Sequence, residues 1–305
     1  MALGSNHVTN TTAATFIPEL WSDEIIAAYK QNLVMANLVS KMSFKGKKGD
    51  TLHIPKPTRG SASVKAASSQ VTLQAATESE VQVLVNKHYE YSRLIEDITE
   101  AQALASLRKF YTGDAGYALA KQVDTDLIQL GRGVNGGSGT AAYNKAVLAG
   151  DGSTLYVDGT NVGNAITDAG IRKIIQTLDD ADVPMDGRVL VLPPVARNTM
   201  MGLARFTEQA FTGETGGGNT IRNGEIGNVY GVKVYVTTNA DTATTNTTRI
   251  GMMFHKDAFV LAEQKGVRSQ TQYKQEYLGT LFTSDMLYGV KELRDEAAIA
   301  IALAA

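Results

Sequence analysis

The longest regular pattern in the chain is a stripe of apolar and small residues that recurs every three or four positions. Such steps place all of these residues on one face of a helix. Asp97 begins a capping-box pattern, and Gly131 is a typical helix stop. The pattern predicts an unbroken helix over about 97–130, with Gly113 and Gly116 as the place for any bend. The stripe consists of Ile98, Ala101, Leu104, Leu107, Tyr111, Ala115, Leu119, Val123, Leu127 and Leu130.

Before this helix, two stretches alternate between apolar and polar residues, as strands do. The first is Gly49–Pro55, and the second runs through Val71–Val85. Residues 58–70 between them are mostly Ser, Ala, Gly, Thr, Lys and Arg, which is too polar to hold a core. Residues 41–88 are therefore predicted to form a β-hairpin with a polar tip. A hairpin of this kind is not stable alone and needs a surface to lie on.

The N-terminal stretch indicates an arm followed by a short helix. Residues before Phe16 are mainly Thr, Asn, Ser and Ala. Trp21, Ile25 and Tyr29 then recur at helical spacing behind Pro18, which favours a short amphipathic helix.

The second half of the chain mixes short helices with short strands. Helices are predicted at 164–181 and 194–203, and the glycine-rich stretches 131–164 and 211–227 carry little pattern. Strand patterns lie at 188–192, 232–236, 250–254, 258–262, 286–293 and 297–303. Together these elements predict an α+β fold with one long helix and mostly antiparallel strands.

Composition places the chain among ordinary globular proteins. It has 305 residues, 43% of them hydrophobic, and a formal charge of −2, which predicts one large or two interleaved domains. Because there is no cysteine, disulfides, thiol nucleophiles and Cys-ligated zinc are excluded, and folding in a reducing cytoplasm is expected. Met1–Thr15 lacks the regions of a signal peptide, and no apolar run reaches the length of a membrane span. A soluble intracellular product is therefore expected.

Positive charge gathers in and beside the predicted hairpin, although the chain as a whole is nearly neutral. Against Asp50 alone stand Lys41, Lys45, Lys47, Lys48, Lys56, Arg59 and Lys65. Two interpretations stay open. The segment is a solvated arm, or it contacts acidic surface on a neighbouring subunit or DNA.

No motif in the sequence identifies a catalytic, cofactor-binding or metal-binding site. Gly131–Gly136 has the form G-x-G-x-x-G, but this fingerprint binds a dinucleotide only between a strand and a helix N-terminus, and here it follows a helix. The acids within Asp179–Asp186 lack the spacing of a calcium loop. The histidines are scattered without a zinc-binding pair: His7, His53, His88 and His255. No catalytic residue, cofactor or metal is predicted.

Five local strings, taken in order, are similar to one protein family. Pro18–Ser22 resembles the end of that family's N-terminal arm, and Gly49–Pro55 the first strand of its extended loop. Gly227–Tyr235 looks like an internal strand, Phe254–Phe259 its following turn, and Tyr288–Lys291 a late strand. The order of arm, long hairpin, very long helix and α/β region is similar as well. The family is that of the tailed-bacteriophage major capsid proteins with the Hong Kong 97-type fold.

The resemblance implies a division of the chain into four parts on the α+β Hong Kong 97-type plan. These are an N-terminal arm at 1–40, an extended β-hairpin loop at 41–88, a peripheral domain at 89–139 and 256–294 that contains a spine helix at about 97–130, and an α/β axial domain at 140–255 and 295–305.

The resemblance also implies function. It indicates a structural protein without enzymatic activity or cofactor, which assembles in the bacterial host cytoplasm as hexamers and pentamers into an icosahedral virion shell around double-stranded DNA. The implied partners are further copies of the chain, a portal protein, a decoration protein and weakly contacted DNA. A separate scaffolding protein is expected too, because no scaffolding extension precedes the arm. The expected inter-subunit contact residues are Trp21, Lys45, Lys47, Lys48, Lys56, Arg59 and Lys65.

Two other functions stay open on the sequence. One is the shell protein of an encapsulin-like nanocompartment built on the same fold. The other is an enzyme whose site the motifs do not reveal.

Overall fold

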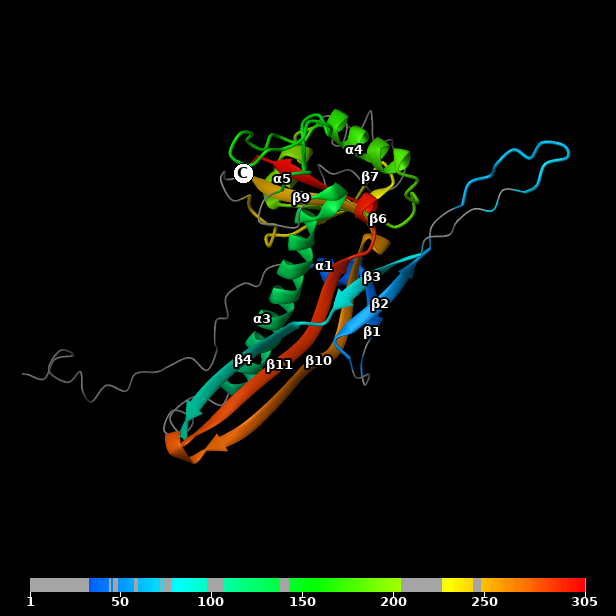
Figure 1. Ribbon diagram of the computed structural model, residues 1–305. Coiled ribbons are helices and arrows are strands. Elements are labelled where there is room, and N and C mark those ends of the chain that lie inside the picture. The colour runs from blue at the N-terminus through cyan, green and yellow to red at the C-terminus, as the bar shows by residue number, and fades with distance from the viewer. Residues whose placement is uncertain are drawn as a thin grey trace, which may run out of the picture.

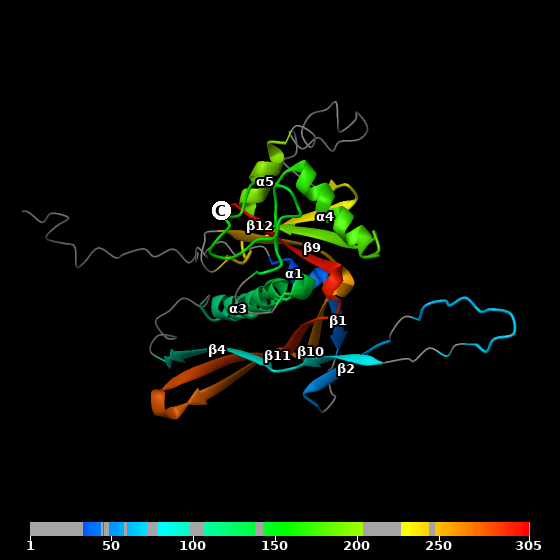
Figure 2. The same ribbon diagram turned by 45° about the horizontal axis from the view of Figure 1, so that its top comes forward.

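A computed structural model describes most of the chain after residue 32. The described residues are 33–43, 45, 49–57, 60–71, 73, 78–97, 107–137, 143–203, 227–243 and 248–304, with the side chains of the long helix described from Tyr111 onward. The long helix α3 (Leu107–Gln129) lies between two β-sheets, and a separate hairpin projects from the body (Figures 1 and 2).

The first sheet, called here the long sheet, has the strand order β1-β10-β11-β4. β10 and β11 pair antiparallel over their whole length and are joined by the turn η5 (Gln275–Tyr277). β4 pairs antiparallel with β11, and β1 pairs parallel with the start of β10. Its strands are β1 (Ser40–Ser43), β4 (Lys87–Glu96), β10 (Phe259–Lys274) and β11 (Gly279–Glu292).

The second, six-stranded sheet has the order β5-β12-β9-β6-β8-β7. Helices α4 (Asp168–Asp180) and α5 (Pro194–Met201) pack on one face, and α3 and its C-terminal turns lie towards the other (Figure 2). Its strands are β5 (Val147–Leu148), β6 (Arg188–Leu192), β7 (Asn228–Val229), β8 (Val232–Val236), β9 (Arg249–His255) and β12 (Ala298–Leu303).

The sequence of β12 shows how the two faces are assigned. Successive side chains of a strand point to opposite faces. The large residues Ile299, Ile301 and Leu303 join the core under α4 and α5, while the alanines between them join the core that contains α3. The small side chains on that face leave room for the end of the long helix.

Local signals set the ends of the two short helices. α4 begins after Thr167, whose Oγ1 accepts a hydrogen bond from the backbone N–H of Gly170 (3.1 Å). α5 begins with Pro194 at its first position, where the missing N–H costs no helical hydrogen bond.

The long helix is buried along the described part of the predicted stripe, and the side chains of Ile98, Ala101, Leu104 and Leu107 lie outside the described residues. Ala115, Leu119, Val123 and Leu127 are buried, together with Ile128. All of these except Ala115 share one core with residues of both sheets and with the short helix α1 (Met35–Leu38). After Gln129 the chain tightens into two 3-10 turns, η2 (Leu130–Arg132) and η3 (Val134–Gly136). Two further 3-10 turns, η4 (Lys256–Ala258) and η6 (Asp295–Ala297), join the sheets to each other.

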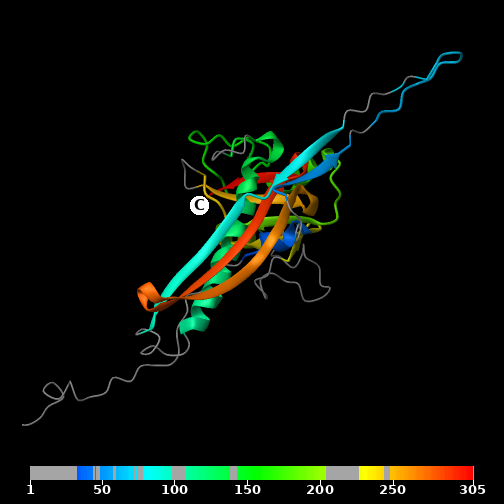
Figure 3. The ribbon, with the colours of Figure 1, turned by 60° about the horizontal axis from the view of Figure 1, so that its bottom comes forward.

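The projecting hairpin consists of β2 (Thr51–Lys56) and β3 (Ser79–Leu84). The strands pair antiparallel, from Thr51 opposite Leu84 to Lys56 opposite Ser79. Figure 3 shows this hairpin and the β10–β11 turn pointing in opposite directions from the body.

Most of the expected elements are confirmed, and three differ. The second hairpin strand was expected to include Val71 and Leu73, but β3 starts at Ser79. Strands expected at 258–262 and 286–293 are instead the long pair β10 and β11, whose outer halves are polar. β4 was not predicted, although Tyr89 and Tyr91 alternate there with exposed residues. The predicted helix start near Asp97 falls mostly on residues 98–106, outside the described residues, and the helix runs unbroken through Gly113 and Gly116.

Replacement of Leu127 by alanine tests the position of the buried stripe. We expect Leu127→Ala to lower the free energy of unfolding by about 2–5 kcal/mol, because a fully buried leucine leaves a cavity. The same change at the half-exposed Leu155 is the control and should cost much less. Urea denaturation of the unassembled chain measures both, and equal losses would contradict the helix register.

Candidate inter-subunit surfaces

The base of the β2–β3 hairpin is fixed to the outer face of the long sheet. Val83 and Val85 are buried against Val260 and Ala262 of β10. β3 crosses β11 so closely that a Cβ on Gly289 would lie 2.2 Å from the carbonyl oxygen of Leu84. Only glycine fits at this crossing, because any side chain would push the two strands apart. The hairpin base is therefore held in a defined direction.

The hairpin tip has no core of its own. Every described residue in 60–71 is exposed. Val64 is fully exposed, Leu73 is 92% exposed, and Val71 is 69% exposed. Exposed apolar side chains that gather on one projecting loop are typical of surfaces that contact another molecule.

The structure describes three of the seven predicted contact residues. Lys56, at the end of β2, and Lys65, in the tip, are exposed on the projecting hairpin. Lys45 lies beside the hairpin base, and its Nζ is 3.7 Å from Oε2 of Glu263 on β10. That surface ion pair contributes little to stability. Trp21, Lys47, Lys48 and Arg59 lie outside the described residues.

A second exposed apolar surface lies at the opposite end of the molecule. Tyr277 and Leu278 at the β10–β11 turn are each more than 60% exposed. Leu278 has a φ of 42°, in the left-handed region that bulky residues avoid. Tyr273 donates a hydrogen bond to Asp97 (2.7 Å) and so ties the turn to the end of β4. The sequence did not point to this surface, because the flanking residues of β10 are polar.

A buried carboxylate links three parts of the chain inside the body. Asp124 of α3 is 1% exposed. Its Oδ1 accepts hydrogen bonds from the backbone N–H groups of Val34 (3.1 Å) and Met35 (2.8 Å), at the start of α1. Its Oδ2 accepts one from Nδ2 of Asn239, in the loop after β8 (3.0 Å). Hydrogen bonds to a charged acceptor are stronger than neutral ones, so Asp124 fixes α1 and this loop on the helix.

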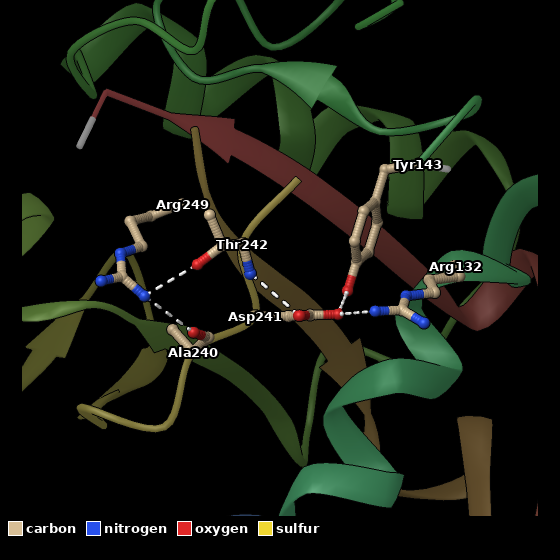
Figure 4. Close-up of polar contacts among 6 residues, drawn as sticks. All are labelled: Arg132, Tyr143, Ala240, Asp241, Thr242 and Arg249. Atoms are coloured by element: carbon tan, nitrogen blue, oxygen red, sulfur yellow. Dashed lines mark hydrogen bonds and ion pairs between the residues drawn. The ribbon is translucent and has the colours of Figure 1, made fainter. Parts of the chain in front are cut away.

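A second carboxylate fixes the C-terminal end of α3 (Figure 4). Oδ2 of Asp241 accepts hydrogen bonds from Nη2 of Arg132 (2.7 Å) and from the hydroxyl of Tyr143 (2.6 Å), and its Oδ1 accepts one from the backbone N–H of Thr242 (2.9 Å). Burial raises the pKa of Tyr143, and the adjacent Asp241 carboxylate raises it further. Tyr143 is therefore a fixed hydrogen-bond donor at neutral pH.

The dinucleotide-like motif serves packing. Gly131–Gly136 forms the turns η2 and η3 at the end of α3. A Cβ on Gly131 would lie 2.4 Å from Sδ of Met252, and one on Gly133 would lie 2.7 Å from Oε2 of Glu292. These glycines let the helix end approach both sheets, and the motif does not stand between a strand and a helix as nucleotide binding requires.

The remaining candidate groups have local partners. His53 lies 2.9 Å from Glu80, His88 lies 3.2 Å from Asp285, and Nδ1 of His255 accepts a hydrogen bond from the backbone N–H of Asp257 (3.2 Å). Asp179 pairs with Nη1 of the buried Arg188 (2.7 Å). His7 lies outside the described residues.

Within the described residues, no three His, Cys, Asp or Glu side chains lie close enough together to hold a metal ion. In the same part of the chain, no helix is both long and apolar enough to cross a membrane.

Comparison with known proteins gives a family and a fold. The family model described as phage capsid protein matches residues 14–304. A structure from Mycobacterium phage Che8 is similar, with a TM-score of 0.73 and 23% identity over 94% of this chain and 97% of that chain. The capsid of Cyanophage P-SCSP1u gives a TM-score of 0.76 and 18% identity over 99% and 97%.

A third structure agrees with these two. The capsid asymmetric unit of Cyanophage Pam1 gives a TM-score of 0.74 and 13% identity over 99% of both chains. At these identities the structures show the shared fold alone, which is the predicted Hong Kong 97-type capsid fold. No curated protein matches the sequence.

Replacement of Asp124 by alanine tests the internal link. We expect Asp124→Ala to lower the free energy of unfolding by at least about 2–3 kcal/mol, because buried N–H donors lose their acceptor. Hydrogen exchange of residues 34–39 should speed up in the same variant. Asp180→Ala, at an exposed acid on α4, is the control. Unchanged exchange at 34–39 would show that Asp124 does not hold α1.

Proposed function

Because the chain belongs to the phage capsid protein family and is a shell-forming structural protein of the virion, we propose that it is the major capsid protein, which assembles as hexamers and pentamers around double-stranded DNA. The observation that carries this proposal is the projecting β2–β3 hairpin. Its base is fixed, while its tip exposes Val64, Val71 and Leu73. The tip gains a hydrophobic contact only when a second subunit covers it.

The geometry favours head-to-tail contacts between copies. The hairpin projects from one end of the body, and the β10–β11 turn lies at the other (Figure 3). A contact between two different surfaces of the same chain is heterologous, and such contacts close into rings when the rotation between subunits allows it. Hexamers and pentamers are rings of this kind.

The four-part division of the chain fits this assembly as a proposal. The strands β4, β10 and β11 with α3 correspond to the peripheral domain, and the six-stranded sheet with α4 and α5 corresponds to the axial domain. The hairpin is the extended loop, and residues 1–40 are the arm.

We propose that a separate scaffolding protein, a portal protein and a decoration protein act on the shell. DNA is contacted weakly, and assembly takes place in the host cytoplasm. The net charge of −2 suits a container that does not bind DNA tightly.

The first test is removal of the hairpin tip. We expect a variant in which Gly60–Gln70 is replaced by a three-residue glycine-serine linker to fold but not to form stable shells, since these residues are exposed in the subunit. Circular dichroism and urea denaturation check the fold, and sedimentation with electron microscopy checks assembly. The unaltered chain, produced with its scaffolding protein, should form shells. Normal shell yield from the deletion variant would disprove a role of the tip in assembly.

The same preparation separates a virion shell from a nanocompartment. Particles made in phage-infected cells should contain double-stranded DNA, as measured by absorbance and nuclease digestion. Particles filled with protein cargo and free of DNA would favour the encapsulin-like alternative.

The second test concerns the positive charge of the hairpin. We expect Lys56→Glu with Lys65→Glu to reduce shell formation most at low salt, because the contact of exposed charges is screened as salt rises. Lys56→Arg with Lys65→Arg keeps the charge and is the matched control. Light scattering during assembly at several salt concentrations measures the effect. Equal assembly of both double variants at every salt concentration would mean that these lysines are only solvated.

A further inference from the structure

The chain crosses between its two sheets at one junction, and it does so twice. β9 of the six-stranded sheet leads through η4 into β10 of the long sheet, and β11 returns through η6 into β12. The two crossings touch, because the backbone N–H groups of Leu293 and Arg294 donate hydrogen bonds to the carbonyl oxygen of Ala258 (2.8 and 3.3 Å). Any change in the angle between the sheets must bend these residues.

The end of the long helix closes the junction from a third side. Oδ1 of Asp295, in η6, accepts a hydrogen bond from the backbone N–H of Gly136 (2.8 Å). Oε2 of Glu292, the last residue of β11, lies where a Cβ of Gly133 would be only 2.7 Å away. Two carboxyl groups from the crossing strand therefore lie against the two glycine turns that follow α3.

The carboxyl group of Glu292 has little compensation for its burial. Oε1 of Glu292 is buried without a hydrogen-bond partner. Burial raises the pKa of Glu292 to about 7, and the Asp295 carboxylate contributes by accepting a hydrogen bond from the acid form and by its charge. Lys291 opposes this rise only weakly. Two carboxylates cannot donate to each other, so a proton on Glu292 supplies the missing hydrogen bond.

Other charged groups lie near the junction. Arg132 of η2 binds Asp241 through Nη2 (2.7 Å), while its Nε is buried without a hydrogen-bond partner. Asp257 of η4 accepts a hydrogen bond from Ser40 (3.1 Å) and lies 3.7 Å from His255. Lys256 beside it is exposed, and Phe259, which pairs with Glu292 across β10 and β11, is apolar.

We propose that Glu292 and Asp295 form a proton-dependent latch that holds the crossing between the two sheets against the end of the long helix. With Glu292 protonated, the pair shares a hydrogen bond and the junction is closed. With Glu292 ionised, two adjacent carboxylates repel each other and the junction loosens. The latch is a property of the subunit fold and does not depend on the proposed shell.

The direction of the pH dependence follows from the raised pKa. Between the ordinary glutamate value of 4.5 and about 7, the folded chain binds more protons than the unfolded chain. The contribution of Glu292 to stability is therefore fully present below about pH 4.5. It is lost as the pH rises to about 7.

Hydrogen exchange of the full-length chain tests the latch. Amide protection of segments 130–137 and 292–297 is measured between pH 5.5 and 8.5 and corrected for the intrinsic pH dependence of exchange. In the unaltered chain we expect protection to fall by about tenfold per pH unit up to about pH 7 and then to level off, since one pKa unit corresponds to a tenfold change in an equilibrium. Glu292→Gln, which keeps a neutral donor for Asp295, should remain protected throughout. Glu296→Gln, at an exposed acid in the same segment, is the control and should follow the unaltered chain.

A second variant keeps the test decisive if Glu292→Gln folds poorly. Asp295→Asn removes the adjacent charge, so the midpoint of the protection change should move to lower pH. Protection that does not change with pH in the unaltered chain would overturn the latch. The same fall in protection in Glu292→Gln would overturn it as well. An unchanged midpoint in Asp295→Asn would overturn the pairing of the two carboxyls.

Discussion

The fold depends on one helix, α3, which is buried against a β-sheet on each of two sides. α3 packs against the long sheet on one side and against the six-stranded sheet at its C-terminal end, within a single core. Apolar burial alone is not directional, so it does not determine how the surrounding loops lie on the helix. Hydrogen bonds to buried carboxylates are directional, and they fix the position of these segments on the helix. Asp124 positions α1 and the loop at Asn239, and Asp126 accepts a hydrogen bond from Tyr288 of β11 (2.6 Å) and lies 3.1 Å from Nζ of Lys87 on β4.

Many polar groups of the body are paired internally, and two of the surfaces that expose large apolar side chains project from it. The hairpin tip and the β10–β11 turn carry exposed large apolar side chains, such as Leu73 and Tyr277. Among the described residues neither is buried: the hairpin base is fixed by the crossing at Gly289, and the turn lies beyond the described end of α3. A subunit built in this way is stable as a body and incomplete at its two ends, which is what repeated head-to-tail assembly requires.

The sequence predicted elements whose pattern reflects burial and missed those whose pattern reflects pairing alone. The stripe from Ala115 to Leu127 and the strand Arg188–Leu192 face the core, so their periodicity is visible. The outer half of β10 is exposed on both faces and is held by hydrogen bonds to β11, which leave no hydrophobic signal. The basic residues of the hairpin were identified, but its exposed Val71 and Leu73 were assigned to a strand. The buried contacts of Asp124, Asp241 and Glu292 join residues far apart in the sequence, and no local sequence motif predicts them.

These features also determine where the subunit can change shape. Motion within the long sheet would break the β10–β11 ladder, and sliding of α3 would expose its core and leave the N–H groups of Val34 and Met35 without their acceptor. Rotation of one sheet relative to the other leaves the strand ladders intact, but it bends the two crossings and shifts the core that both sheets share around α3. The glycines at 133 and 136 bring no side chains to this contact. In the proposed latch, the interaction between Glu292 and Asp295 changes from an attractive hydrogen bond to charge repulsion when Glu292 loses its proton. A change in the angle between the two sheets therefore acts on this junction and on the part of the core around α3 that both sheets share.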